Sequence, residues 1–92
     1  MLKAVATLVH MDWQHDIGFD RPVTSRQVMA FASPALQARL VSLLRRSKKW
    51  SYVGIGHALY KIKDREVNGV VLVQYKRSWD YASLWTLKRS TL

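Results

Sequence analysis

The sequence predicts a small α+β domain, with helices in its N-terminal half and an antiparallel β-hairpin toward its C-terminal end. Apolar residues recur at helical spacing over residues 2–13 and 34–47, and Asn68-Gly69 separates two strand-like runs. The chain has 92 residues, of which 49% are hydrophobic. This length suits one core, so we expect residues 1–92 to form a single domain.

The first predicted helix covers residues 2–13, where strict alternation of apolar residues fails. Gly18 and Pro22 predict a loop after it. Thr24 and Gln27 form a capping-box pattern, which predicts a short helix over residues 25–32.

Ser33-Pro34 predicts the start of a further helix, with serine at the N-cap and proline at the first helical position. We expect this helix to run to about Ser47. One stripe of it is apolar and predicted to be core: Leu36, Leu40, Leu43 and Leu44. The opposite side carries small and basic residues.

After residue 49 the composition favours strands. Residues 50–56 are strand-like, although Gly54 and Gly56 permit a bend. Asn68-Gly69 predicts a type I′ turn that joins strands near 58–67 and 70–77. That pairing would place Lys61, Lys63 and Arg65 on one face of the ribbon.

The final segment, residues 78–92, has two interpretations. Ser78 is a candidate helix cap, and we predict a C-terminal helix. Alternation of Trp79, Tyr81, Ser83 and Trp85 would equally suit a strand.

Charge is the strongest functional signal. The net charge is +9 and the isoelectric point is about 10.4. Residues 1–20 carry one lysine against three aspartates, a net of −2, whereas residues 21–92 carry 14 basic against three acidic residues, a net of +11. Such a field attracts polyanions, and nucleic acid is the commonest of these.

Other classes of function have little support. The absence of cysteine excludes disulfides and thiol chemistry, and the sequence shows neither a membrane span nor a signal peptide, so we expect a cytoplasmic protein. His10, Asp12, His15 and Asp16 form a cluster without an established metal spacing, and a solvated helix end is the favoured interpretation. We predict no enzymatic activity, metal or cofactor.

The order of the predicted elements resembles the winged helix-turn-helix family. The resemblance covers residues 20–77 and is carried by residues 22–28, 33–40 and 43–46 and by a hairpin from Tyr60 to Arg77. The expected architecture is three N-terminal helices, a C-terminal hairpin wing and the additional C-terminal helix predicted from Ser78. The resemblance implies that Pro22-Val23 is a short edge strand. The turn at residues 54–57 is an alternative position for the wing. The resemblance also implies duplex DNA binding, a role in transcription regulation and a homodimer formed through residues 1–16 and 78–92.

In this interpretation helix 34–47 enters the major groove, because an α-helix fits there. The predicted base-reading residues are Ala35, Ala38, Arg39 and Ser42. Predicted phosphate contacts are Arg26, Arg45, Arg46, Lys48 and Lys49, and the predicted wing contacts are Lys61, Lys63 and Arg65.

Simpler explanations exist for the same residues. Cations at a helix C-terminus favourably meet its dipole, and lysines on an edge strand prevent aggregation. Four tryptophans also permit an RNA or single-strand binding module that works by stacking. A protein-interaction adaptor with the same fold is the third hypothesis.

Overall fold

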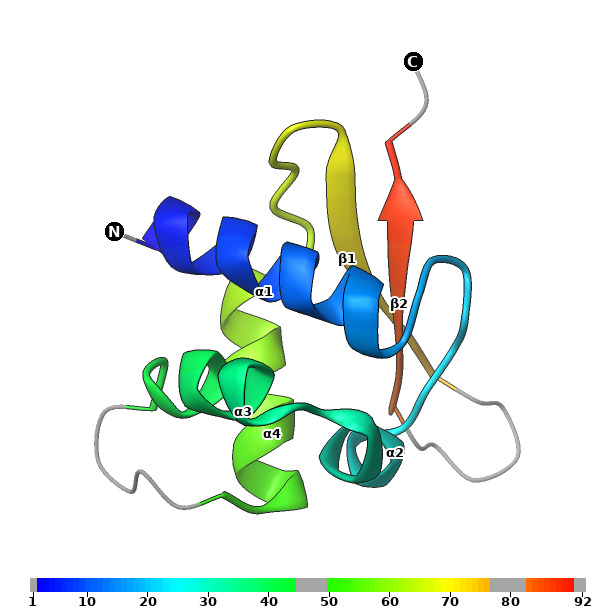
Figure 1. Ribbon diagram of the computed structural model, residues 1–92. Coiled ribbons are helices and arrows are strands. Elements are labelled where there is room, and N and C mark those ends of the chain that lie inside the picture. The colour runs from blue at the N-terminus through cyan, green and yellow to red at the C-terminus, as the bar shows by residue number, and fades with distance from the viewer. Residues whose placement is uncertain (1, 45–49, 77–82, 91–92) are drawn as a thin grey trace.

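The computed structural model describes residues 2–44, 50–76 and 83–90. Four helices, one more than the three expected, precede one hairpin in this part of the chain: α1 (Leu2–Asp16), α2 (Ser25–Phe31), α3 (Pro34–Val41), α4 (Tyr52–Ile62), β1 (Val70–Lys76) and β2 (Ser83–Arg89) (Figure 1). The architecture is therefore α+β, with helices packed on one face of a two-stranded antiparallel sheet.

Both predicted cap signals form as expected. The Thr24 hydroxyl accepts a hydrogen bond from the Gln27 backbone N–H, and the Gln27 side chain accepts one from the Thr24 N–H. The Ser33 hydroxyl accepts from the Leu36 N–H, with Pro34 opening α3. These caps fix the tight connection between α2 and α3.

The segment before α2 adds a third, minimal strand to the hairpin. Val23 and Trp85 exchange backbone hydrogen bonds of 3.0 and 2.7 Å, on the edge of β2 that β1 leaves free. The prediction that Pro22-Val23 forms a short edge strand is confirmed at Val23. The spatial order is Val23, β2, β1.

A single core joins the helices to the sheet. Its largest fully buried side chains come from α1, α3, α4 and both strands, and they include Trp13, Leu36, Leu40, Ile55, Leu59, Ile62, Leu72, Trp85 and Leu87. The predicted apolar stripe of α3 is confirmed for Leu36, Leu40 and Leu43, whereas Leu44 is partly buried at the edge of the core.

Helix α3 is shorter than predicted: it ends at Val41, not near Ser47. The N–H groups of Leu43 and Leu44 bond to carbonyls three residues back, which tightens the chain out of α-helical geometry. The Ser42 hydroxyl also donates to the Arg39 carbonyl, a bond that competes with helix continuation. Residues 45–49 lie outside the described residues.

The predicted strands over residues 50–67 are wrong, because residues 52–62 form α4. Ser51 caps this helix by accepting from the Gly54 N–H at 3.1 Å. The buried residues Ile55, Ala58, Leu59 and Ile62 fall at the i, i+3, i+4, i+7 spacing of a core-facing helix side. Packing of this stripe outweighs the helix-breaking glycines and β-branched residues.

The Asn68-Gly69 turn is confirmed, but its strands differ from the prediction. Asn68 and Gly69 have φ of 53° and 76°, and Val67 and Val70 exchange two hydrogen bonds across them. Pairing stops at that bridge, and β1 pairs with β2 instead, with Leu72 opposite Leu87. The predicted C-terminal helix is therefore wrong over Ser83–Arg89, which is a strand; residues 77–82 and 91–92 lie outside the described residues.

Candidate nucleic-acid interface

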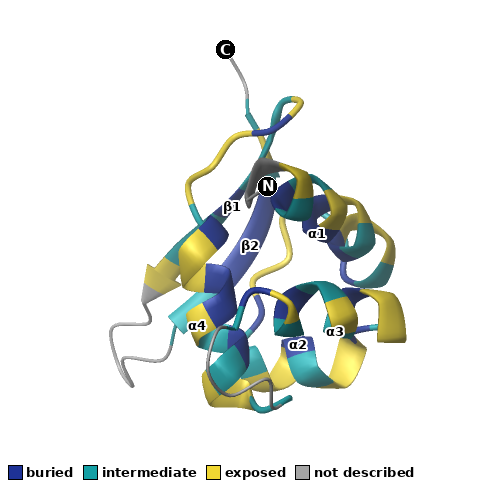
Figure 2. Ribbon diagram, turned by 90° about the vertical axis from the view of Figure 1, so that its left-hand side faces the viewer, coloured by how far each residue is buried: buried dark blue, intermediate teal, exposed yellow. Residues whose placement is uncertain are grey.

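The side of α4 that faces away from the core is the most distinctive exposed helix surface of the described chain. Val53 and Tyr60 are 57% and 61% exposed, Tyr52 is 47% exposed, and His57 is exposed as well. In Figure 2, α4 lies at the left and α1 at the right. We call Val53, His57 and Tyr60 the outer row of α4.

Cations lie at both ends of this surface. The Arg26 guanidinium of α2 lies 4.9 Å from the centroid of the Tyr52 ring. The Lys63 ammonium, just after α4, lies 4.5 Å from the centroid of the Tyr60 ring. Cation–π contacts of this kind hold a long side chain over an aromatic face. The Lys63 ammonium also lies 3.8 Å from Oδ2 of Asp64. The predicted phosphate ligand Arg26 is therefore an exposed cation beside the outer row.

Helix α2 is held close to the middle of α4. A Cβ atom at Gly56 would lie 3.6 Å from the Ser25 hydroxyl oxygen, an ordinary van der Waals contact. The α2–α4 crossing therefore has room for a methyl group at Gly56.

The predicted base-reading residues of α3 do not form one uniform surface. Ala35, Ala38 and Ser42 are exposed, as the helical spacing predicts. Arg39 instead turns toward α1: its Nε lies 3.4 Å from Oδ2 of Asp12, and both atoms are buried. An arginine held in this way has its charge compensated before any nucleic acid arrives.

The three predicted wing residues are not on the hairpin, so this prediction is wrong. Lys61 lies in the last turn of α4, Lys63 is its C-cap, and Arg65 lies in the loop that follows. The Lys61 ammonium donates to the Leu43 carbonyl, and the Arg65 Nε donates to the Lys61 carbonyl at 3.4 Å. The error follows from the helix α4, which had been predicted as a strand.

Four of the predicted phosphate ligands, Arg45, Arg46, Lys48 and Lys49, lie outside the described residues. In the sequence they immediately precede Trp50 and the Ser51 cap of α4.

Sequence reasoning missed the helix α4, and with it the exposed side on which Tyr52, Val53, His57 and Tyr60 lie. The signal that would have found them is Ser51, three residues before Gly54, followed by apolar residues at positions 55, 58, 59 and 62. That pattern is a helix start followed by one helical face, and it leaves the four side chains on the remaining faces.

The histidines and aspartates of α1 are either buried or in contact with other residues of the chain. His10 is 4% exposed, neither ring nitrogen has a hydrogen-bond partner within the described chain, and burial lowers its pKa. His15 Nδ1 lies 3.0 Å from Asp16 Oδ1. In the described residues no three His, Cys, Asp or Glu side chains come together as a metal site.

None of the described helices has the length and apolar character needed to cross a membrane. No protein-family model matches the sequence, and comparison with curated proteins and with solved structures finds no similar protein.

Proposed function

We propose that the chain is a duplex DNA-binding domain of the winged helix-turn-helix type, which places α4 in the major groove and acts as a transcription regulator. The arrangement that supports this proposal is a helix, a one-residue edge strand at Val23, three further helices and a hairpin whose last strand is central. The recognition helix of a helix-turn-helix lies in the major groove, and α4, the helix that directly precedes the hairpin, is our candidate for it.

The observation that carries the proposal is the outer row of α4 with its flanking cations. An 11-residue helix is about 16 Å long, enough to lie across a major groove about 12 Å wide. The His57 imidazole can donate to or accept from a base edge, and the Val53 methyl groups suit contact with a thymine methyl. Arg26 and Lys63 lie at opposite ends of the row, where phosphates flank the groove.

Helix α4 is a better candidate than α3 for two reasons. The outer side of α3 offers alanines and a serine, while its arginine is paired with Asp12. Both helices pack against two others, α3 against α1 and α4, and α4 against α2 and α3, but Val53 and Tyr60 of the outer row remain 57% and 61% exposed.

The hairpin supplies the wing of this proposal. Its strands run away from the Val67–Val70 turn toward residues 76 and 83, and the sequence there continues Lys76-Arg77. Residues 77–82, which join the two strands, lie outside the described residues, so the hairpin is proposed as the wing from its strand order alone.

The decisive experiment measures fluorescence anisotropy of a labelled random-sequence duplex and of the matching single strand across a salt titration. We expect preference for the duplex and a log–log salt slope steeper than about −3, which corresponds to at least roughly three neutralised phosphates. Binding that favours the single strand would replace the proposal with a stacking module. No salt-dependent binding to either would replace it with a protein-interaction role.

Two arginines provide matched variants. The Arg26 guanidinium lies over the Tyr52 ring beside α4, whereas the Arg89 guanidinium, at the C-terminal end of β2, lies 4.4 Å from the centroid of the Phe19 ring. Each substitution by alanine removes one charge and one cation–π contact. We expect Arg26→Ala to shallow the salt slope by about one unit and Arg89→Ala to leave it unchanged. Equal effects would show that charge acts without a defined contact surface.

A further inference from the structure

The face of the hairpin that points away from the helices is unusually apolar. Leu72 and Leu87 face each other in the core, so the alternate pairs, Val73 with Thr86 and Tyr75 with Leu84, belong to the outer face. An antiparallel strand with one solvated face normally alternates apolar and polar residues. The run Val70 to Val73 lacks that alternation.

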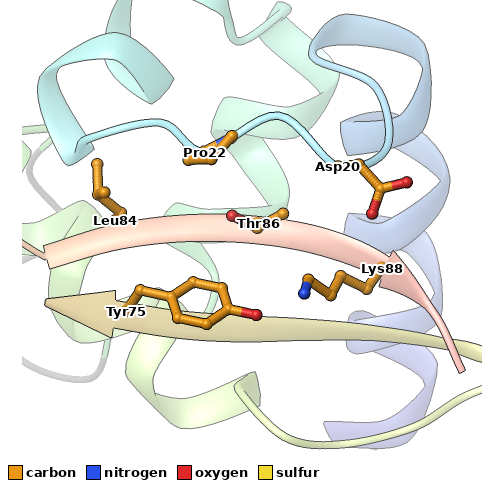
Figure 3. Close-up of a pocket in the computed structure, with 6 residues that line it drawn as sticks. All are labelled: Asp20, Pro22, Tyr75, Leu84, Thr86 and Lys88. Atoms are coloured by element: carbon orange, nitrogen blue, oxygen red, sulfur yellow. The ribbon is translucent and has the colours of Figure 1, made fainter.

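A pocket of about 330 Å³ lies on this face. It crosses β2 and is lined by Asp20, Pro22, Tyr75, Leu84, Thr86 and Lys88 (Figure 3). The volume is at the low end of the range for small-molecule sites. Pro22, Leu84 and the Tyr75 ring supply its apolar surface.

Thr86 is the polar group that points to a ligand. The residue is 2% exposed, and its hydroxyl has no hydrogen-bond partner within the described residues. A buried hydroxyl without a partner costs free energy, because it has lost water and gained nothing. Since Thr86 lines the pocket, a bound molecule with a polar atom can supply the missing partner.

Two opposite charges lie on either side of Thr86. Figure 3 shows the Asp20 carboxylate on one side of β2 and the Lys88 ammonium on the other, with the Tyr75 hydroxyl directed toward Lys88. The Lys88 nitrogen is 5.1 Å from the Tyr75 ring centroid. The hydrogen bond with Tyr75 and, less strongly, the Asp20 charge raise the pKa of Lys88, so the ammonium stays charged. Within the described chain no cation pairs with Asp20 and no carboxylate pairs with Lys88.

The size of the face argues against a second protein as the occupant. Two seven-residue strands present a surface about 23 Å long and about 10 Å wide. A stable protein interface buries about 800 Å² on each partner, several times this area. A small molecule fits the pocket and requires no more surface than is present.

We infer that this pocket binds a free α-amino acid with an apolar side chain. The ammonium group of the ligand would face Asp20, its carboxylate would face Lys88 and the Tyr75 hydroxyl, and its side chain would cover Pro22 and Leu84. Thr86 would donate to the ligand carboxylate. A zwitterion satisfies both charges at once, whereas a simple acid or a simple amine leaves one of them unpaired. The inference does not depend on DNA binding.

The test is an NMR titration of the ¹⁵N-labelled full chain with three related probes. L-leucine carries both charges, 4-methylpentanoate lacks the ammonium group, and 3-methylbutylamine lacks the carboxylate. We expect saturable shifts at the amides of Leu84, Thr86 and Lys88 with leucine, without comparable shifts in α4. Each single-charge probe should bind about tenfold more weakly.

Two variants test which charged group of the ligand Asp20 and Lys88 each bind. Asp20→Asn should weaken leucine binding about tenfold and leave 4-methylpentanoate unchanged; asparagine also tolerates the positive φ of 56° at this position. Lys88→Gln should weaken leucine and 4-methylpentanoate alike. Arg89→Gln is the matched control. Arg89 follows Lys88 in the chain, but its side chain belongs to the opposite face of β2, so we expect this substitution to leave leucine binding unchanged.

Thr86→Val separates binding from folding. Valine has nearly the same shape without the hydroxyl, so we expect a higher thermal midpoint together with weaker leucine binding. The inference is overturned if leucine causes no saturable shifts at the pocket. It is also overturned if 4-methylpentanoate binds as well as leucine, or if leucine binds the Asp20→Asn and Lys88→Gln variants with unchanged affinity.

Discussion

Oδ2 of Asp16 accepts a hydrogen bond of 2.9 Å from the backbone N–H of Ser33, and this bond joins the end of α1 to the N-cap of α3. The Asp16 side chain is 6% exposed, and its other oxygen lies 3.0 Å from His15 Nδ1. Burial alone would raise the pKa of Asp16, but the hydrogen bonds from His15 and Ser33 outweigh burial and hold that pKa below its ordinary value of 3.8. The charged carboxylate therefore stabilises the α1–α3 junction.

We expect Asp16→Ala to lower the free energy of unfolding by about 1–3 kcal/mol, because the Ser33 N–H loses its partner in a partly buried place. Asp16→Asn keeps an acceptor oxygen for the Ser33 N–H, so we expect it to lower the free energy of unfolding less than Asp16→Ala does. The folded-state pKa is lowered, so the contribution of the charge is complete above pH 3.8 and disappears as the pH falls through the folded value. Urea unfolding of the wild type and both variants at pH 7 measures the difference; equal stability of the Asp16→Ala and Asp16→Asn variants would contradict it.

The local signals of this sequence were reliable because their structure depends on neighbouring residues alone. The capping box at Thr24, the Ser33 cap and the Asn68-Gly69 turn each satisfy backbone groups within four residues. The stripe of α3 followed from the same local periodicity.

The identity of α4 and the partner of β1 depend on distant residues, and both were predicted wrongly. Tyr52, Val53 and Gly54 favour extended structure locally, and only burial of Ile55 and Leu59 among the other helices makes the segment helical. The turn at Asn68 determines one bridge, but burial of Leu72 against Leu87 selects β2 as the partner. The exposed outer row of α4 was consequently missed, and the wing was assigned to Lys61, Lys63 and Arg65, which lie at the end of a helix or just after it.

Two glycines should respond in opposite directions to alanine. Gly69 has φ of 76°, where alanine is strained, so Gly69→Ala should destabilise the chain by about 1–2 kcal/mol. Gly56 lies inside α4 in ordinary contact distance of Ser25, so Gly56→Ala should stabilise it by up to about 1 kcal/mol. Thermal unfolding of both variants measures this, and a loss of stability in Gly56→Ala would mean that α2 cannot accommodate the methyl group.

Buried His10 should make stability depend on pH. Its pKa is lowered from 6.5 by burial, so the unfolded chain binds the proton first as the pH falls. Stability from this residue is complete above pH 6.5 and decreases below it, until the folded-state pKa is reached. The slope is at most about 1.4 kcal/mol per pH unit for one group.

Unfolding measurements between about pH 7.5 and pH 5 test this dependence with two variants. His10→Leu removes two unpartnered nitrogens from an apolar site and should flatten the slope. His57→Gln, at an exposed position of α4, should keep the wild-type slope. An unchanged slope in His10→Leu would assign the pH dependence to other groups.

The choice between α4 and α3 as the groove-reading helix predicts a difference in base preference. A duplex selected from random sequences for tight binding to the wild type provides the reference. We expect His57→Ala to reduce the protein's preference for this selected duplex over random duplex by about 1–3 kcal/mol, because one base-edge contact is lost. Arg39→Ala should leave this preference unchanged, since Arg39 is paired with Asp12, and should cost less than about 1 kcal/mol of stability. The measurement is competition binding between the selected and the random duplex at fixed salt. A loss of preference in Arg39→Ala with none in His57→Ala would return the reading role to α3, as the sequence alone predicted, and would require the Asp12 ion pair to open on binding.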